Sequence, residues 1–147
     1  MEIIEIKTNK KQYIDLLLLA DEQESMINKY IDIGKMYALI DDGVKTVCIV
    51  TNEGNGVLEI KNLATNPNYQ KHGYAKTMIN YISKIHKDNF SILQVGTGNN
   101  TSNVLFYEKC GFKKSHLIKN FFINNYNHPI IEDGVQLIDM IYLQKYL

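Results

Sequence analysis

The stretch Tyr69-Gln70-Lys71-His72-Gly73-Tyr74-Ala75 decides the fold, because it separates two segments of different hydrophobic period. Before it, residues 57–65 largely alternate apolar and polar side chains, which is typical of a strand. After it, apolar residues recur at three- and four-residue steps, which predicts an amphipathic helix over residues 73–87. We therefore expect a strand-to-helix turn whose last residues open the helix.

The start of this helix is suited to binding an anion. The first N–H groups of a helix have no partner within it, and the helix dipole makes that end positive. Gly73 has no side chain and Ala75 has only a methyl group, so a ligand could approach the backbone amides closely. An ordinary helix start with a convenient glycine is the alternative interpretation of this stretch alone.

Length and composition predict a single domain over residues 1–147. Of the 147 residues, 45% are hydrophobic and 22% are charged, which is ordinary for a globular protein. The formal net charge is zero, so no nucleic-acid partner is expected. All 16 basic residues are lysines. A bound anion must therefore rely on backbone amides and lysine side chains, without bidentate arginine contacts.

Cysteine and histidine usage narrows the class further. The two cysteines, Cys48 and Cys110, occur without a signal peptide, which predicts reduced thiols in the cytoplasm. The apolar run 16–19 is too short to span a bilayer, so no membrane partner is expected. The four histidines lack the spacing of a metal-ligand set, so no metal is expected.

The order of the predicted elements indicates a mixed sheet with helices on both faces. We expect strands at residues 2–6, 36–40, 44–50, 57–65, 90–95 and 135–143, and an extended segment at 112–123. The sequence Asp41-Asp42-Gly43 predicts a hairpin turn, and we expect loops at 96–100 and, unusually long, at 124–134. We expect helices at residues 13–20, at 26–31 with Ser25 as the N-cap, at 73–87 and at 102–109. The strand–helix–strand units need a crossover, so part of the sheet must be parallel. The apolar last strand, if it formed an edge, would need covering, which predicts a homodimer.

Two motifs together resemble the GNAT superfamily, the Gcn5-related N-acetyltransferases, and the resemblance covers essentially the whole chain. Residues 70–75 match the family's Arg/Gln-x-x-Gly-x-Gly/Ala turn. Residues 99–112 match its asparagine-rich segment, its tyrosine-bearing helix and the Gly-Phe that follows. The resemblance implies an α/β fold (α+β mixed sheet) with a central mixed sheet of about seven strands. Helices would cover both faces, and two parallel strands would splay at the cofactor site.

The resemblance also implies an acetyl-CoA-dependent N-acetyltransferase. Backbone amides from Lys71 to Lys76 would hold the pyrophosphate, and the pantetheine arm would pair with the preceding strand. The Leu63 N–H would polarise the thioester carbonyl, as in an oxyanion hole. The implied cofactor-binding residues are Leu63, Ala64, Thr65, Gln70, Lys71, His72, Gly73, Tyr74, Ala75, Lys76, Asn99, Asn103 and Tyr107, with Asn100 as a further candidate. Loop and capping chemistry is the alternative role for each asparagine.

Candidate catalytic and substrate-binding residues follow from the same resemblance. Tyr107 holds the position of the usual general acid and would protonate the departing thiolate, unless it only packs on the cofactor. Glu59 is the candidate general base, acting through water. In the loop 124–134, His128 and Glu132 are candidate substrate-binding residues, and a solvated turn at Glu132-Asp133 is the alternative.

The predicted acceptor is the primary amine of a small molecule. Acetylation of a protein N-terminus or lysine, and a non-catalytic acyl-CoA-binding module, are the alternatives. Residues 96–98 lack the third glycine of a dinucleotide fingerprint, so a Rossmann oxidoreductase is rejected. Without arginine, the 3′-phosphate of CoA would need Lys71, Lys76, another lysine or exposure to solvent.

Overall fold

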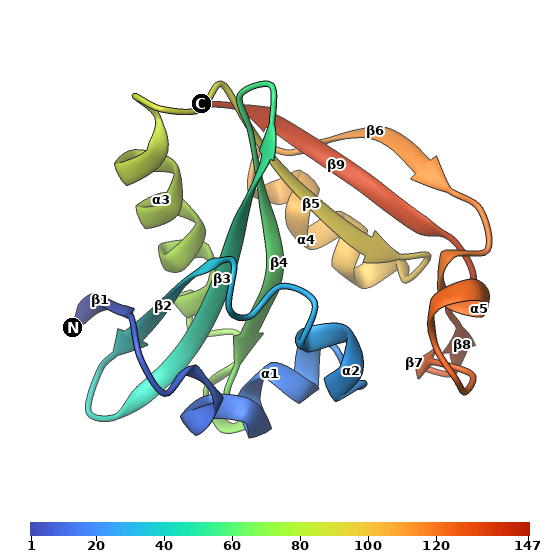
Figure 1. The fold of residues 1–147 in the computed structure, drawn as a ribbon, viewed down its shortest axis with the longest axis horizontal. Coiled ribbons are helices and arrows are strands. Elements are labelled where there is room, and N and C mark those ends of the chain that lie inside the picture. The colour runs from blue at the N-terminus through green and yellow to red at the C-terminus, as the bar shows by residue number, and fades with distance from the viewer.

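The computed structural model describes residues 1–147 and contains a seven-stranded sheet beside a two-stranded hairpin (Figure 1). The strand order is β1-β2-β3-β4-β5-β9-β6, and every pair is antiparallel except β4–β5. The strands of this sheet are β1 (Glu2–Ile6), β2 (Lys35–Ile40), β3 (Val44–Gly54), β4 (Val57–Thr65), β5 (Ile92–Gly98), β6 (Lys113–Ile118) and β9 (Met140–Tyr146). The hairpin consists of β7 (Ile131–Glu132) and β8 (Val135–Gln136). The expected mixed sheet of seven strands with one parallel pair is therefore confirmed.

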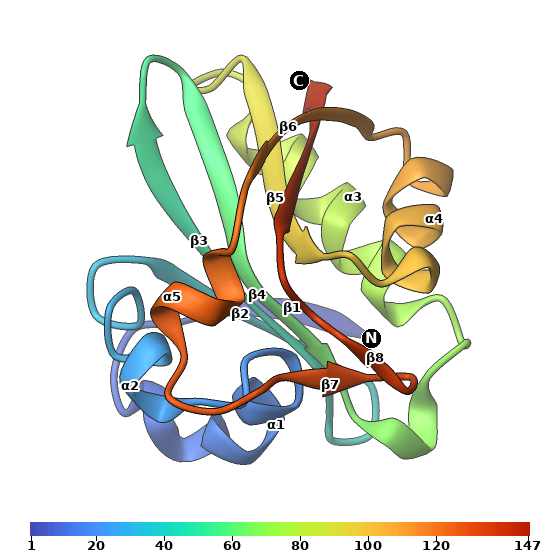
Figure 2. The same ribbon diagram turned by 90° about the vertical axis from the view of Figure 1, so that its right-hand side faces the viewer.

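Helices cover both faces of the sheet, as predicted (Figure 2). They are α1 (Ile14–Ala20), α2 (Glu24–Ile27), α3 (Tyr74–His86), α4 (Thr101–Lys109) and α5 (Phe121–Asn125), with 3-10 turns η1 (Lys10–Tyr13) and η2 (Pro67–Tyr69). One core packs α3 and α4 on the sheet through fully buried residues such as Met78, Ile82 and Phe112. A second core packs α1 and the segment after it on the other face, through Leu17 and Ile31.

The parallel pair β4–β5 opens into a V (Figure 1). The two strands pair from Val57↔Ile92 to Ile60↔Val95 and then separate. Beyond that point β4 stays with β3, whereas β5 stays with β9. The splay predicted at the cofactor site is present.

A β-bulge lies in β4 where the splay begins. Val50 pairs with Ile60 and Ile49 pairs with Asn62, so Lys61 is an extra residue without a partner in β3. A bulge bends a strand and increases its local twist. The bulge therefore turns β4 away from β5 at the position where their pairing ends.

The C-terminal third differs from the prediction. The expected last strand 135–143 is wrong, because residues 135–136 belong to the hairpin and β9 begins only at Met140. Asp133 and Gly134 both have positive φ, as the tight turn between β7 and β8 requires. The predicted loop 124–134 therefore includes the strand β7 and this turn. The predicted extended segment 112–123 includes β6 but runs into the short helix α5, whose N-cap Asn120 also has positive φ. Its apolar and polar residues follow no single period that would have located these breaks.

Smaller corrections concern three elements. Residues 96–98, predicted as loop, belong to β5, where Gly96 and Gly98 approach side chains of β9 and Leu137 too closely for a Cβ atom. The short helix α2 begins at Glu24 with Gln23 as its N-cap, so Ser25 does not cap it. The helix predicted at 73–87 is α3, and Gly73 is its N-cap.

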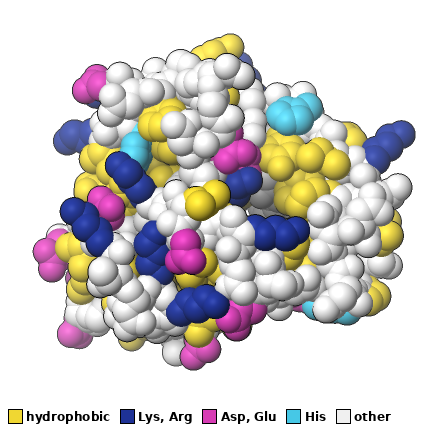
Figure 3. Space-filling model, viewed as in Figure 1, with side chains coloured by type: hydrophobic (Ala, Val, Ile, Leu, Met, Phe, Trp, Pro, Cys, Tyr) yellow, Lys and Arg dark blue, Asp and Glu magenta, His cyan; other side chains and the backbone are white.

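β9 lies between β5 and β6 and is not an edge, so the reason given for expecting a homodimer does not hold. The edges are β1 and, beside β9, β6, all of whose residues are exposed, including Leu117 and Ile118. Figure 3 shows hydrophobic side chains gathered at the upper right, where Figure 1 places β6 and β9. Elsewhere on this face, lysine and acidic side chains are interspersed. None of the helices combines the length and apolar character needed to cross a membrane.

Acidification is expected to destabilise the fold through His86. Its Nε2 lies 3.1 Å from the Tyr37 hydroxyl, and burial, together with the charge of Lys35, lowers its pKa. The unfolded chain, with a histidine pKa of about 6.5, therefore takes up this proton at higher pH than the folded chain. The stability that neutral His86 contributes is complete above about pH 6.5 and is lost as the pH falls toward the folded-state pKa.

Urea unfolding of the parent and of His86→Gln, at about pH 7.5 and about pH 5.5, measures this linkage. The variant should lose less stability between the two pH values than the parent. His116→Gln, at an exposed histidine, is the control and should behave like the parent. Equal losses in the parent and His86→Gln would contradict the assignment.

Candidate active site

The opening between β4 and β5 forms a cavity of about 880 Å³, within the usual range for ligand pockets. Its walls come from the diverging ends of β4 and β5, the turn before α3, the first turns of α4, the end of α1 and the hairpin β7–β8. These segments are far apart in sequence, and the strand order brings them to one end of the sheet. The cavity reaches from the N-terminus of α3 to a group of carboxylates.

The turn before α3 presents a row of free backbone donors. The N–H groups from Lys71 to Lys76 donate to no acceptor in the protein, and the first hydrogen bond of α3 runs from Thr77 N–H to Gly73 O, at 3.0 Å. Lys71 and Gly73 both have positive φ, which directs successive amides toward one concave side. With the helix dipole, the arrangement suits a phosphate group.

Gly73 leaves this row of amides accessible. Its φ is 82°, and a Cβ atom built at this position would meet nothing within 4 Å. The glycine therefore serves backbone conformation and ligand approach, and it is not there to relieve crowding. Lys71 and Lys76 also line the cavity and supply the nearby positive charge.

The backbone of β4 beyond the bulge has one free side. Asn66 N–H donates to Lys45 O in β3, at 2.8 Å. Because backbone groups alternate sides along a strand, Ala64 also faces β3, whereas Leu63 and Thr65 face the opening left by β5. The Thr65 carbonyl accepts a hydrogen bond from Gln70 Nε2, at 3.4 Å, which agrees with this direction. The Leu63 N–H therefore points into the splay.

Tyr107 lines the cavity from α4. Its ring packs edge-on against Phe106 and Phe112, with centroids 5.1 Å and 5.6 Å away. The side chain is partly exposed to the cavity, and its hydroxyl makes no hydrogen bond within the protein. Burial, assisted by neighbouring thiols and Glu132, raises the pKa of Tyr107 well above its ordinary value. The hydroxyl therefore keeps its proton at any ordinary pH.

The asparagines at the start of α4 connect it to the hairpin. Asn100 caps the helix by accepting from Ser102 N–H, at 2.9 Å, and its amide donates to Asp133 and Glu132. Asn103 donates to Glu132, at 3.4 Å. Asn99 accepts from Ile138 N–H, at 2.8 Å, and its Nδ2 donates to Gln136 O. The structure thus gives these side chains capping and tethering contacts; Asn103 also lines the cavity, whereas Asn99 does not.

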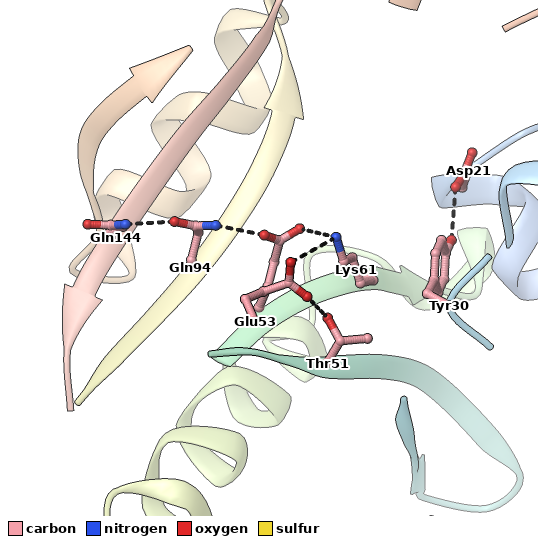
Figure 4. A network of polar contacts seen from close by, with 8 residues as sticks. Asp21, Tyr30, Thr51, Glu53, Lys61, Gln94 and Gln144 are labelled. Carbon is pink, nitrogen blue, oxygen red and sulfur yellow. Dashed lines mark hydrogen bonds and ion pairs between the residues drawn. The ribbon is translucent and has the colours of Figure 1, made fainter. Parts of the chain in front are cut away.

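Glu59 does not line the cavity. The side chain is 5% exposed, and its carboxylate accepts from Gln94 Nε2, at 2.7 Å, and pairs with Lys61 Nζ, at 2.8 Å. Gln94 in turn accepts from Gln144 Nε2, at 2.6 Å, so a polar row crosses β4, β5 and β9 (Figure 4). The row lies where the parallel strands are still paired. It stabilises the closed part of the sheet, and the general-base role predicted for Glu59 gains no support from this position.

Acidic side chains gather at the far end of the cavity, and sequence reasoning found only part of this group. Glu132 and Asp133 line the cavity, and so do Asp21 and Glu22 at the end of α1. His128 does not line it; the imidazole is exposed, with Nε2 2.9 Å from Glu22 Oε1. Asp21 was missed because nothing local marks it, since its partners come from distant segments.

The loop before the hairpin is held against the end of α1. The Asp21 carboxylate accepts hydrogen bonds from Tyr30 and Tyr126, at 2.9 Å and 2.6 Å, and Figure 4 shows the Tyr30 contact. Asn127 N–H donates to Gln23 Oε1, at 3.1 Å. These contacts hold the loop and hairpin as one wall of the cavity. No group of three or more His, Cys, Asp or Glu side chains is placed to hold a metal ion.

A mixed sheet that splays beside a helix N-terminus with free amides is the arrangement of a CoA-dependent acyltransferase, and comparison with known proteins identifies the family. Residues 32–114 match the sequence model of the acetyltransferase (GNAT) domain. The chain therefore belongs to the GNAT family of acetyltransferases. The uncharacterized N-acetyltransferase YvbK of Bacillus subtilis (strain 168) is 34% identical over 140 residues, which cover 93% of this chain and 90% of the relative.

Solved structures share the whole fold. A GNAT family acetyltransferase from Elizabethkingia anophelis, with acetyl-CoA bound, superposes with a TM-score of 0.92 at 30% identity and covers 99% of this chain and 97% of its own. An IAA acetyltransferase from Bacillus cereus ATCC 14579 has a TM-score of 0.90 at 31% identity, with 99% and 100% covered. A Bacillus subtilis acetyltransferase in complex with CoA has a TM-score of 0.89 at 30% identity, with 99% and 98% covered.

Proposed function

We propose that the protein transfers an acetyl group from acetyl-CoA to the primary amine of a small molecule. The observation that carries the proposal is the cavity itself, in which free amides at the α3 N-terminus and the inward Leu63 N–H line one continuous space. Phosphates suit the former and a thioester carbonyl suits the latter. Solved relatives that contain acetyl-CoA or CoA support this choice of cosubstrate.

In this mechanism the amine attacks the thioester carbonyl carbon directly. The Leu63 N–H donates to the carbonyl oxygen as negative charge develops there. As the carbon–sulfur bond breaks, the Tyr107 hydroxyl donates its hydrogen bond and then its proton to the departing sulfur. The nitrogen loses a proton to water or to a cavity carboxylate, and Tyr107 is reprotonated.

A small acceptor is favoured over a peptide by the enclosure of the acceptor end. The hairpin β7–β8 is tied to α4 through Asn100 and Asn103, and the loop before it is tied to the end of α1 through Tyr126. These contacts fix two walls beside the acceptor end, which suits a small molecule better than an extended peptide. Binding of the acceptor by Glu132 is part of the proposal, whereas His128 would act only through Glu22.

The cellular setting stays a prediction. Both cysteines are free thiols, with Cys48 buried and Cys110 partly exposed, which suits a reducing compartment such as the cytoplasm. A homodimer also stays a prediction, and it now depends on the exposed edge strand β6.

Acetyl-CoA is expected to bind without added metal, and a primary amine should accelerate release of the free thiol. Isothermal calorimetry measures the first and a thiol-reactive dye measures the second. CoA itself should also bind, because it carries the same phosphates as acetyl-CoA. Absence of binding at millimolar ligand would refute the function, and binding without thiol release for any amine or peptide would favour the non-catalytic module.

A further inference from the structure

Four carboxylates at the acceptor end of the cavity have no lysine partner that would neutralise their negative charge. Asp21 and Glu22 come from the end of α1, and Glu132 and Asp133 come from the hairpin turn. Glu22 contacts the exposed imidazole of His128, and every lysine in an ion pair bonds to other carboxylates. Burial raises the pKa of Glu132, and the charges of Asp133 and Glu22 add to this effect.

The carboxylates are held in place by neutral donors. Tyr30 and Tyr126 each donate to one oxygen of Asp21, and Asn100 donates to Asp133. Such contacts orient the groups without neutralising them. Their charge is therefore available to a ligand, and a metal ion is not its natural partner because no three such groups converge.

Asn62 gives an independent indication of a ligand at this end. Its side chain is 2% exposed and lines the cavity, and its Nδ2 donates to Leu17 O and to the Tyr30 hydroxyl, at 3.0 Å and 3.1 Å. Its Oδ1 is the one buried side-chain N or O atom in the protein without a hydrogen-bond partner. An unpaired buried acceptor is unfavourable, and an N–H donor from a ligand would satisfy it.

The position of Asn62 relates that donor to the reaction. Asn62 directly precedes Leu63, whose N–H points into the splay, and it connects through Tyr30 to Asp21. An amine that donates to Asn62 Oδ1 would lie beside the thioester carbonyl. The carboxylates of the hairpin, Glu132 and Asp133, line the same cavity and could bind the other end of such a ligand.

The carboxylates must bind a positively charged group other than the nitrogen that attacks the thioester. An amine must be neutral to attack, and nearby carboxylates stabilise its ammonium form, which raises its pKa and opposes attack. Carboxylates favour the transition state when they bind a charge that persists throughout the reaction. We propose, on the basis of the proposed function, that the acceptor is an alkyl diamine or polyamine, with one amine acetylated and a second ammonium held by Glu132 and Asp133.

A matched series of five-carbon amines tests this. The second end carries an ammonium in 1,5-diaminopentane, a hydroxyl in 5-amino-1-pentanol, a methyl in pentylamine and a carboxylate in 5-aminopentanoate. With acetyl-CoA saturating, kcat/KM for thiol release should be at least about tenfold higher for the diamine than for the alcohol, the size of one charge-assisted hydrogen bond. The carboxylate should be the poorest acceptor.

Isosteric variants identify the residues responsible. Glu132→Gln with Asp133→Asn should remove most of the preference for the diamine, measured as the ratio of kcat/KM for the diamine to kcat/KM for the alcohol. A purely structural effect would lower all four rates together. Glu108→Gln, an exposed carboxylate on α4 outside the cavity, is the matched control and should keep the full preference.

The outcomes separate this proposal from the one it depends on. If calorimetry detects no acetyl-CoA binding, the proposed function fails. If acetyl-CoA binds but the diamine and the alcohol react equally, or no amine in the series reacts, the diamine proposal alone is overturned. A preference that survives in the double variant would overturn the assignment to Glu132 and Asp133.

Discussion

Replacing Gly73 with glutamate is expected to abolish acetyl-CoA binding while leaving the fold intact. Nothing lies within 4 Å of a Cβ atom at this position, so the new side chain extends into the space over the free amides. Its charge would repel the phosphates and compete for the donors from Lys71 to Lys76. Loss of two or more charge-assisted hydrogen bonds corresponds to about a thousandfold in affinity or more.

The controls for this experiment come from the chain itself. Gly54 has φ of 84°, close to the 82° of Gly73, and also has open space, but it is the last residue of β3 and does not line the cavity. Gly54→Glu should bind acetyl-CoA like the parent, and Gly73→Ala should separate backbone strain from charge. Calorimetry gives the affinities and circular dichroism checks the fold. Parent-like binding by Gly73→Glu would show that the turn has only a structural role.

Replacing Tyr107 with phenylalanine is expected to reduce turnover about a hundredfold, equivalent to roughly 3 kcal/mol of activation free energy. The ring would stay between Phe106 and Phe112, and no hydrogen bond within the protein would be lost. Only a proton that burial keeps on the hydroxyl disappears. The interaction belongs to the transition state, so acetyl-CoA affinity should change little.

Tyr81→Phe is the matched control for Tyr107→Phe. Tyr81 packs on Tyr37 in the same core, its hydroxyl makes no hydrogen bond, and it lies outside the cavity. Single-turnover thiol release measures chemistry separately from product release. Unchanged chemistry in Tyr107→Phe would make it a packing residue, and weaker acetyl-CoA binding with unchanged turnover at saturation would make it a binding residue.

Local patterns predicted the fold where the chain changes period. The switch at Gly73 and the hairpin signal Asp41-Asp42-Gly43 located the meander, α3 and the need for a parallel pair, all of which the structure contains. The region after Phe112 carries no such switch. Its apolar residues serve a strand, a short helix, a hairpin and a second strand in turn, and the breaks depend on tertiary contacts such as Asp139 accepting from Asn120 N–H, at 2.9 Å.

The candidate site was predictable where function depends on backbone, and less so where it depends on distant side chains. Gly73 and the strand beside Leu63 could be found from a motif and a periodicity. Asn62 and Asp21 could not, since their meaning comes from Tyr30 and from Tyr126, the latter 105 positions from Asp21 in the sequence. Alternation was also insufficient to place Glu59, because it gives two faces without saying which one borders the cavity.

The bulge at Lys61 constrains how this protein can change over evolution. Before it, Leu58 and Ile60 pack in the core of α3; after it, Ala64 packs in the core of α1, although all three would share a face in a regular strand. Deleting Lys61 would leave a regular ladder in which residues 62–65 keep their partners in β3 and their faces, so the strand would still pair. The loss would be the local bend and extra twist that turn β4 away from β5. Insertions and deletions are therefore tolerable in the surrounding loops, whereas the nine residues of β4 must be inherited with their one extra residue if the cavity is to stay open.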